Sequence, residues 1–326
     1  MMEFFLSPTF WKTVLASTTP VMLATLAANM MTKSGIFNLA IEGTMLICAL
    51  TGVIASAFTQ NLWIGCLTAV VMGVVISFIF GYFALVMKGA MNACGVAVNL
   101  IATGGTVFVL VMLTGSKANS SALKSLTFPV VNIPVLKDIP VLGTIFSGQN
   151  LVTYIAWAIV AVTAWMLYKT KLGINIRAVG ENPAAAKAAG LSVLKHQFAA
   201  LTICGVSCSF GGMYLSMGNM QVFIVNMTAG RGFIGVAADA MGRGNPIGAM
   251  IASLLFGSAN AVANVLQINS FSSDVVMAIP YVVSIAGIII YSAHEQQVKE
   301  KRIRKEMKEA EREEKTYGKN SGNHRL

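Results

Sequence analysis

Two blocks of this sequence place ionisable and amide side chains inside otherwise apolar segments. The first block, residues 33–45, carries Asn38 and Glu42 four positions apart, a spacing that puts both on one face of a helix. A carboxylate in an apolar helix costs free energy and generally faces a bundle interior, a partner or a cavity. The block predicts either a pore or gate, or structural anchoring in which Glu42 complements a helix N-terminus or pairs with Lys33.

The second block, residues 226–246, combines five glycines with Asn226, Arg231, Asp239 and Arg243. Glycines allow breaks in a helix, which membrane proteins tolerate where the backbone lines a cavity or is covered by protein. Asn226, Arg231 and Asp239 therefore join the first block as candidates for a translocation path or gate. The alternative is tight helix packing, with Asp239 and Arg243 forming an i, i+4 ion pair.

A third block has the pattern of a short capped helix. Asn182 can cap a helix, Pro183 suits its first position, and Gly190 supplies a left-handed residue just beyond its end. The spacing predicts a helix of about two turns, which is marginal alone and needs anchors or a partner. Its alanines form a slim rod that fits another protein's groove.

The composition defines the class. Of the 326 residues, 56% are hydrophobic and 11% are charged, against about 25% charged in soluble domains. Long apolar runs predict an all-α, polytopic membrane bundle rather than a barrel. We expect about nine spans, within a range of eight to ten, the ninth being a short, glycine-interrupted segment at 228–241. The others lie near 12–31, 36–57, 62–87, 93–115, 151–168, 198–218, 246–268 and 273–291.

Charge orients these spans. Five cations face one acid in the loop 169–197, which predicts that this loop is cytoplasmic. The charged tail 293–326 then also lies inside, the loop 116–150 outside, and the N-terminus outside, with residues 1–292 as the membrane domain. The net charge is +10, and the basic residues responsible for it gather beside predicted membrane edges. This distribution favours contact with anionic lipid over binding of nucleic acid.

Motifs for hydrolysis, metals and cofactors are missing. The sequence contains no GxxxxGK[ST] phosphate loop, no HExxH, and no nucleophile placed beside a base. The five cysteines fall in apolar segments without zinc-type spacing, so we interpret them as small buried hydrophobes. We therefore expect no catalytic residue, metal or cofactor, and an energy source outside the chain.

Three blocks together carry a family resemblance over about residues 12–291. GIFNLAIEG (35–43), TKLGINIRAVGENPAAAKAAGLS (170–192) and GRGFIGVAADAMGRGNPIGA (230–249) resemble, in this order, permease subunits of bacterial ABC importers. The chain is similar to the branch containing ribose, branched-chain amino acid and nucleoside permeases, and most to its nucleoside and simple-sugar members. It departs from the nucleoside-type pattern at residues 91–100.

The resemblance implies a fold, a site and partners. Gly180 to Gly190 would form the cytoplasmic coupling helix that docks on an ATP-binding cassette subunit. Its motif residues would be Gly180, Glu181, Asn182, Pro183, Ala186 and Gly190, with Ala186 on the contact face. A companion permease and an extracellular substrate-binding lipoprotein are also implied, in the bacterial cell membrane.

The resulting hypothesis is a non-catalytic permease that moves nucleosides, purines foremost, by alternating access. The nearest alternative is the same machine carrying a sugar or a branched-chain amino acid. An ion-coupled secondary transporter would use Glu42 and Asp239 as ion sites, but it lacks a matching inverted repeat. A membrane enzyme would lack its active site.

Overall fold

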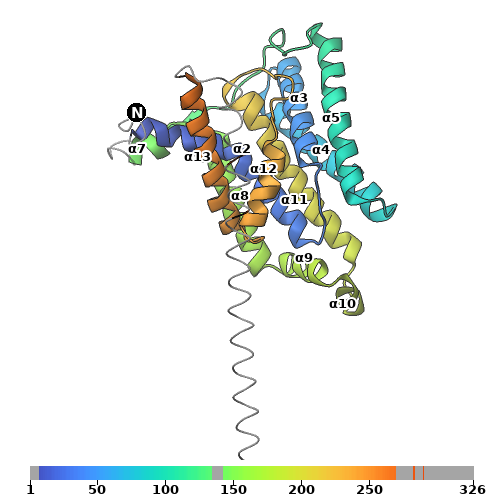
Figure 1. Ribbon diagram of the computed structural model, residues 1–326. Coiled ribbons are helices and arrows are strands. Elements are labelled where there is room, and N and C mark those ends of the chain that lie inside the picture. The colour runs from blue at the N-terminus through green and yellow to red at the C-terminus, as the bar shows by residue number, and fades with distance from the viewer. Residues whose placement is uncertain (1–6, 134–141, 269–281, 283–288, 290–326) are drawn as a thin grey trace, which may run out of the picture. The chain divides into compact units, whose positions relative to one another are not determined.

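A computed structural model describes residues 7–133, 142–268, 282 and 289. The chain divides into two compact units, residues 1–280 and 281–326, and all elements named below belong to the first (Figure 1). Seven helical stretches in the described residues are long and apolar enough to cross a membrane. They are α2 (Pro8–Lys33), α3 (Ile41–Thr59), α4 (Leu62–Gly81) with the π-helix η1 (Tyr82–Val86), α5 (Met91–Thr114), α8 (Leu151–Lys169), α11 (Val193–Met213) with the π-helix η2 (Tyr214–Asn219), and α13 (Pro246–Ile268).

These seven stretches match seven of the segments expected from the sequence. The expected span at 273–291 lies outside the described residues except for 282 and 289, and so does the boundary at 292. The short segment at 228–241 contains helix α12 (Arg231–Met241), whose 11 residues cover about 16 Å. Because the hydrocarbon core is about 30 Å thick, α12 alone is too short to cross it, and the count of nine spans is not confirmed.

Local capping explains where many of the helices begin. At each of five helix starts, one side-chain oxygen accepts a hydrogen bond from a backbone N–H of the first turn. The capping residues are Ser7, Asn61, Asn150, Thr170 and Asn182. Polar residues at the edges of apolar runs thus fix the residue at which each of these helices begins.

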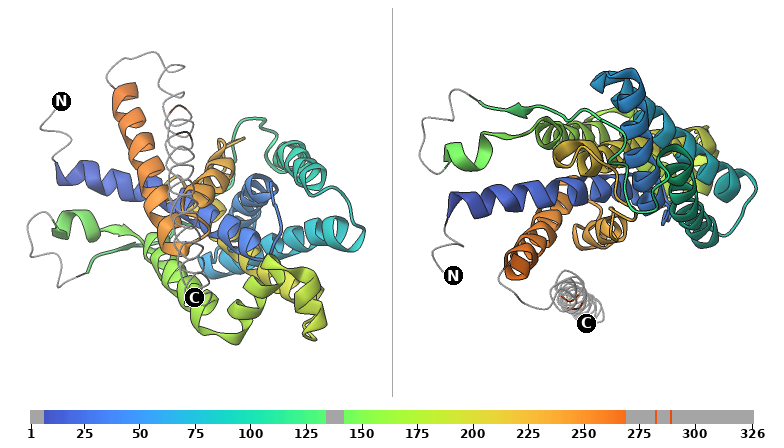
Figure 2. Two further views of the ribbon diagram at one scale, coloured as in Figure 1. Left: turned by 60° about the horizontal axis from the view of Figure 1, so that its bottom comes forward. Right: turned by 90° about the horizontal axis from the view of Figure 1, so that it is seen from above.

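Helix α2 lies at the centre of the bundle and contacts α11, α12 and α13 (Figure 2). Glycines allow the closest approaches. A methyl group added at Gly235 of α12 would lie 2.6 Å from the Cβ atom of Ala24 in α2. One added at Gly73 of α4 would lie 2.6 Å from the carbonyl oxygen of Gly205 in α11. Small residues therefore set these interfaces, as expected in a membrane bundle.

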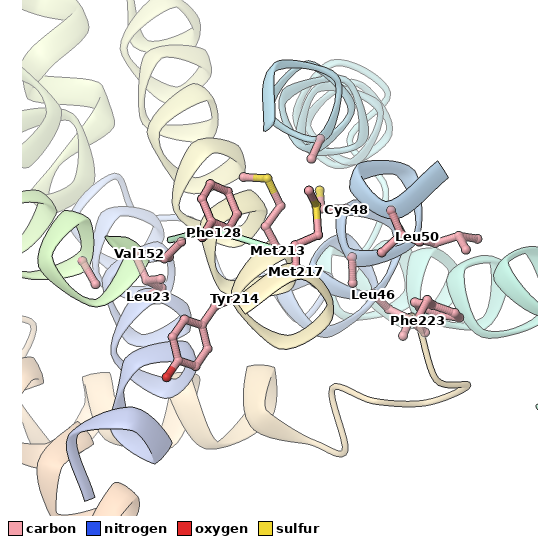
Figure 3. Close-up of a cluster of buried hydrophobic side chains, with 14 of the residues drawn as sticks. Leu23, Leu46, Cys48, Leu50, Phe128, Val152, Met213, Tyr214, Met217 and Phe223 are labelled. Atoms are coloured by element: carbon pink, nitrogen blue, oxygen red, sulfur yellow. The ribbon is translucent and has the colours of Figure 1, made fainter. Parts of the chain in front are cut away.

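A cluster of buried hydrophobic side chains connects helices with two loops (Figure 3). It joins Leu23 of α2, Leu46 of α3 and Met213 of α11 to Phe128 and Phe223, which come from two loops. All five side chains are at most 2% exposed. These loops are thus packed parts of the fold.

The expected external loop 116–150 contains more structure than the all-α prediction allowed. Strands β1 (Val130–Val131) and β2 (Gln149–Asn150) pair antiparallel, and the short helix α7 (Leu142–Phe146) precedes β2. The loop also bonds to the segment after η2 through an isolated bridge between Asn119 and Ile224.

At the other end of the bundle lie helices α9 (Lys171–Glu181) and α10 (Pro183–Ala188), away from the loop that follows α5 (Figure 1). We call residues 170–192 the α9–α10 arm. The sequence predicted α10 but not α9, which supplies the larger part of this arm.

Candidate functional site

Glu42 lies in the first turn of α3 and holds the start of α12. Its Oε1 accepts a hydrogen bond from the backbone N–H of Gly230 (2.8 Å), and its Oε2 accepts one from Gly232 (2.6 Å). A methyl group on Gly232 would lie 2.6 Å from the Cα atom of Glu42, so only glycine permits this approach. A carboxylate at a helix N-terminus is stabilised by the positive end of the helix dipole. Hydrogen bonds to a charged group each contribute about 1.5–3 kcal/mol to the free energy of folding.

Asn38 does not share a helical face with Glu42, and this part of the prediction is wrong. Helix α3 begins at Ile41, so Asn38 lies in the turn before it. There its Oδ1 accepts a hydrogen bond from the N–H of Ala40 (2.8 Å), which closes a local Asx turn. The buried side chain of Asn38 thus shapes the turn from which Glu42 emerges.

Asn99 of α5 also holds the start of α3. Its Oδ1 accepts from the N–H of Gly43 (2.8 Å), and its Nδ2 donates to the carbonyl oxygen of Leu39 (2.9 Å). These two bonds flank Glu42 in sequence. They fix the backbone that carries the carboxylate.

Asp239 lies near the other end of α12 and binds α2. Its Oδ1 accepts from Nδ2 of Asn29 (2.7 Å), and its Oδ2 accepts from Oγ1 of Thr32 (2.7 Å). The expected i, i+4 helical spacing of Asp239 and Arg243 is absent, because α12 ends at Met241 and Arg243 has a φ of +56° in the following turn. Asp239 is therefore an anchor between two helices.

Arg231 is the first residue of α12, and Asn226 lies in the loop just before it. The Arg231 guanidinium donates to the carbonyl oxygens of Met227 (3.0 Å) and Thr228 (3.2 Å). Asn226 is exposed in the preceding loop, with a φ of +60°. Of the five residues expected along a path, Glu42, Asn226 and Arg231 thus lie near the start of α12 and Asp239 near its end, about 12 Å away for the eight steps from Arg231 to Asp239. Asn38 stays in the turn before α3.

The α9–α10 arm has the caps that its sequence predicts. Oδ1 of Asn182 accepts from the N–H of Ala185 (3.0 Å). At the other end, Gly190 has a φ of +83°, its N–H donates to Lys187, and the N–H of Leu191 donates to Ala186, both at 3.0 Å. These paired bonds form a Schellman motif, so both ends of α10 are fixed by local sequence.

Ala186 lies on the inner face of α10, which corrects the predicted contact face. Its side chain is only 5% exposed, and α10 contacts α9 and α11. The residues two positions away on either side, Ala184 and Ala188, are exposed. At 100° per residue they point nearly opposite to Ala186, so they mark the outward face of α10.

Gly180 connects the arm to the turn between α2 and α3. Its Cα atom lies against the backbone of Lys33 and Gly35, and a methyl group added at Gly35 would lie 3.1 Å from Gly180. Gly35 also has a φ of +73°, which favours glycine. Glu181, in contrast, is exposed at the end of α9.

Sequence reasoning missed two groups that the structure brings into the site. Thr32 binds Asp239, although threonines in helices usually bond to their own backbone and give no signal of a distant partner. Arg177 of α9 was treated only as one of several loop cations. Its Nε atom is buried and has no hydrogen-bond partner among the described residues.

The comparisons with known proteins agree with this architecture. A family model described as "Branched-chain amino acid transport system / permease component" matches residues 11–290. The guanosine ABC transporter permease protein NupQ of Bacillus subtilis is 32% identical over 280 residues, covering 82% of this chain and 87% of the relative. The nucleoside ABC transporter permease protein NupC of Lactococcus lactis is 30% identical, covering 85% and 90%.

Two further matches are more distant. The ribose import permease protein RbsC of Escherichia coli is 25% identical, covering 79% of this chain and 86% of the relative. An ABC transporter of metal-chelate type, solved in an inward-facing conformation, shares the fold with a TM-score of 0.50 at 14% identity, covering 87% of this chain and 85% of the other. Because the family model covers most of the sequence, this chain belongs to the branched-chain amino acid transport system permease family.

Proposed function

We propose that this chain is the membrane-spanning subunit of an ABC importer that brings purine nucleosides into the cell. The observation that carries the cargo assignment is the similarity to a guanosine and a nucleoside permease at 32% and 30% identity over most of the chain. The chain itself acts as a transport subunit without an enzymatic reaction. Hydrolysis of ATP occurs on a partner subunit.

The α9–α10 arm is the proposed docking site for that ATPase subunit. Its outward face carries alanines, its ends are capped, and its position is fixed by backbone contact with the α2–α3 turn. A smooth and pre-organised surface loses little conformational entropy when a partner docks. We place this arm, and with it the C-terminus, on the cytoplasmic side.

A mechanical route leads from the arm to α12. Gly180 touches the backbone of Lys33 and Gly35 so closely that the two segments must move together. The same turn leads into α3, where Glu42 binds the first N–H groups of α12. Movement of the ATPase would therefore reach α12 through α9, the α2–α3 turn and Glu42, and would open the bundle alternately to each side.

The remaining partners complete the importer. A companion permease, identical or different, would form the second half of the path, and a substrate-binding lipoprotein would deliver cargo at the end that carries β1 and β2. A sugar importer is the second candidate, because the ribose permease of Escherichia coli is 25% identical. The cargo must therefore be tested directly.

Uptake into proteoliposomes distinguishes these functions. The chain reconstituted with its ATPase, companion permease and binding lipoprotein should accumulate labelled guanosine when ATP is present. Excess inosine should compete, whereas excess ribose should not. A non-hydrolysable ATP analogue and liposomes with this chain alone are the controls. Guanosine uptake by the chain alone in response to an ion gradient would favour a secondary transporter, and competition by ribose would favour the sugar importer.

A further inference from the structure

A groove of about 320 Å³ lies between α8 and α11, the two helices that precede and follow the α9–α10 arm. This volume lies within the range of small-molecule sites, about 300–1,000 Å³. On α8 the groove runs from Ile155 to Met166, about 16 Å of helix, and on α11 it runs from Thr202 to Ser207. Most of the side chains that line it are apolar, so its wall suits a hydrocarbon chain.

Two hydroxyl groups interrupt this apolar wall. Thr163 of α8 and Ser207 of α11 line the groove and are only 3% and 1% exposed. Hydroxyls inside helices commonly donate to the carbonyl oxygen four residues back, as Thr202 does to Phe198 (3.0 Å). Within the described residues, the side chains of Thr163 and Ser207 have no hydrogen-bond partner. Because a buried hydroxyl without a partner is unfavourable, both donors are suited to a ligand with acceptor oxygens.

Two lysines continue the rows of residues that border the groove. Lys169 follows Met166 by three positions on α8, and Lys195 precedes Thr202 by seven positions on α11. Both spacings keep a residue on nearly the same face of a helix. Both lysines are exposed, and neither side chain has an ion-pair partner in the part of the chain that the structure describes. No carboxylate of the described residues lines the groove, so its end nearer the arm is cationic.

The order of these groups along α8 matches the order of the parts of a phospholipid. Lys169 ends the helix, and Trp165, one turn earlier, is 63% exposed, as is typical at the level of the lipid headgroups. Thr163 lies six residues, about 9 Å, before Lys169, and Ile155 lies about 12 Å further along the helix. From the arm inward, the groove thus presents cations, then hydroxyls, then an apolar wall. A phospholipid presents a phosphate, then ester carbonyls, then acyl chains.

We propose that this groove binds an anionic phospholipid from the leaflet on the side of the arm. The phosphate lies at Lys169 and Lys195, and the ester carbonyl oxygens accept hydrogen bonds from Thr163 and Ser207. One acyl chain follows the groove toward Ile155. Such a lipid bridges the helices that enter and leave the α9–α10 arm, so it stabilises the spacing of the two attachments of the arm. The site depends neither on the cargo nor on the ATPase of the proposed function.

Lipid titration of the full chain in detergent, followed by native mass spectrometry, tests the headgroup contacts. Phosphatidylglycerol should bind about tenfold or more tightly than phosphatidylcholine with the same acyl chains, because each lysine near a lipid surface attracts anionic lipid. The double variant Lys169→Gln/Lys195→Gln should bind the two lipids equally. Lys117→Gln/Lys124→Gln removes the same charge from two exposed positions in the loop after α5 and should keep the wild-type preference. An equal loss of preference in this control would overturn the proposal, because net charge alone would then attract the lipid.

The hydroxyl contacts have a test that needs no variant. A phosphatidylglycerol with ether-linked chains has the same headgroup but no ester carbonyls. The wild type should bind it about tenfold more weakly than the ester form, the effect of losing two ordinary hydrogen bonds. Thr163→Val/Ser207→Ala should bind the ester form as weakly as the wild type binds the ether form. Equal wild-type binding of the ester and ether forms would overturn the proposal. Binding of neither lipid would do so too, because another helix would then cover the groove.

Discussion

At the scale of single residues, Glu42 and Asp239 both attach α12 to a neighbouring helix, one at each end of α12. Glu42 binds the first backbone N–H groups of the helix, and Asp239 binds side chains of α2. Of the two interpretations of Glu42, this geometry favours anchoring. The alternative with Lys33 as partner receives no support, because both oxygens of Glu42 bind the backbone of α12.

Substitution of Glu42 separates anchoring from a gate. Glu42→Gln leaves one acceptor oxygen and turns an amide donor toward the other N–H, so one of two hydrogen bonds is lost. Glu42→Ala loses both, with a cost of about 1–3 kcal/mol for each backbone group left unsatisfied. We therefore expect the unfolding temperature in detergent to fall in the order wild type, Gln, Ala. Glu181→Gln, which changes an exposed carboxylate, is the control and should unfold like the wild type. Unchanged unfolding of Glu42→Gln together with lost guanosine transport would support a gate.

The residue partners show why the sequence predicted only part of the site. The partners of Glu42 lie 188 and 190 positions away, and those of Asp239 lie 210 and 207 positions away. Nothing in the spacing of one sequence indicates such pairs. The Asn182 cap spans three residues, in contrast, and the sequence predicted it correctly because its chemistry is local.

At the scale of elements, the arm illustrates the same distinction. The Asn182 and Gly190 caps fix where α10 begins and ends, but the face that it buries depends on α9 and α11. Because α9 was not foreseen, Ala186 was assigned to the wrong face. The seven apolar helices were predictable, since hydrophobic length alone identifies a span.

The outward face of α10 gives a sharper test of docking than Ala186. Ala188→Arg places a bulky cation on the exposed face at the C-terminal end, where a positive charge is favourable to the helix dipole. The helix should therefore stay intact while co-purification of the ATPase falls at least tenfold. Ala188→Ser keeps the surface slim and should retain binding. Full ATPase binding and coupling by Ala188→Arg would show that this face is not the docking surface.

At the scale of the whole molecule, the described part of the bundle has two distinct ends. Lys33 and Gly180 meet at one end, and the loop after α5 meets Ile224 at the other. The charges predict which end is inside: the loop 169–197 carries five cations and one acid, and positively charged loops favour the cytoplasmic side. Helix α8 connects Asn150 to the arm, and its 19 predominantly apolar residues are long enough to cross a membrane between the two ends.

Cysteine labelling with a membrane-impermeant reagent tests this orientation. Lys124 in the loop after α5 and Lys187 in α10 are both exposed, so a cysteine at either position should be reactive. In right-side-out vesicles Lys124→Cys should be labelled and Lys187→Cys should be protected, and inside-out vesicles should reverse the result. The wild type measures the background from the five native cysteines, of which Cys48, Cys204 and Cys208 are buried. Detergent should expose both sites equally. Labelling of both from one side would mean that α8 does not cross the membrane, and a reversed pattern would place the arm outside, where it cannot meet a cytoplasmic ATPase.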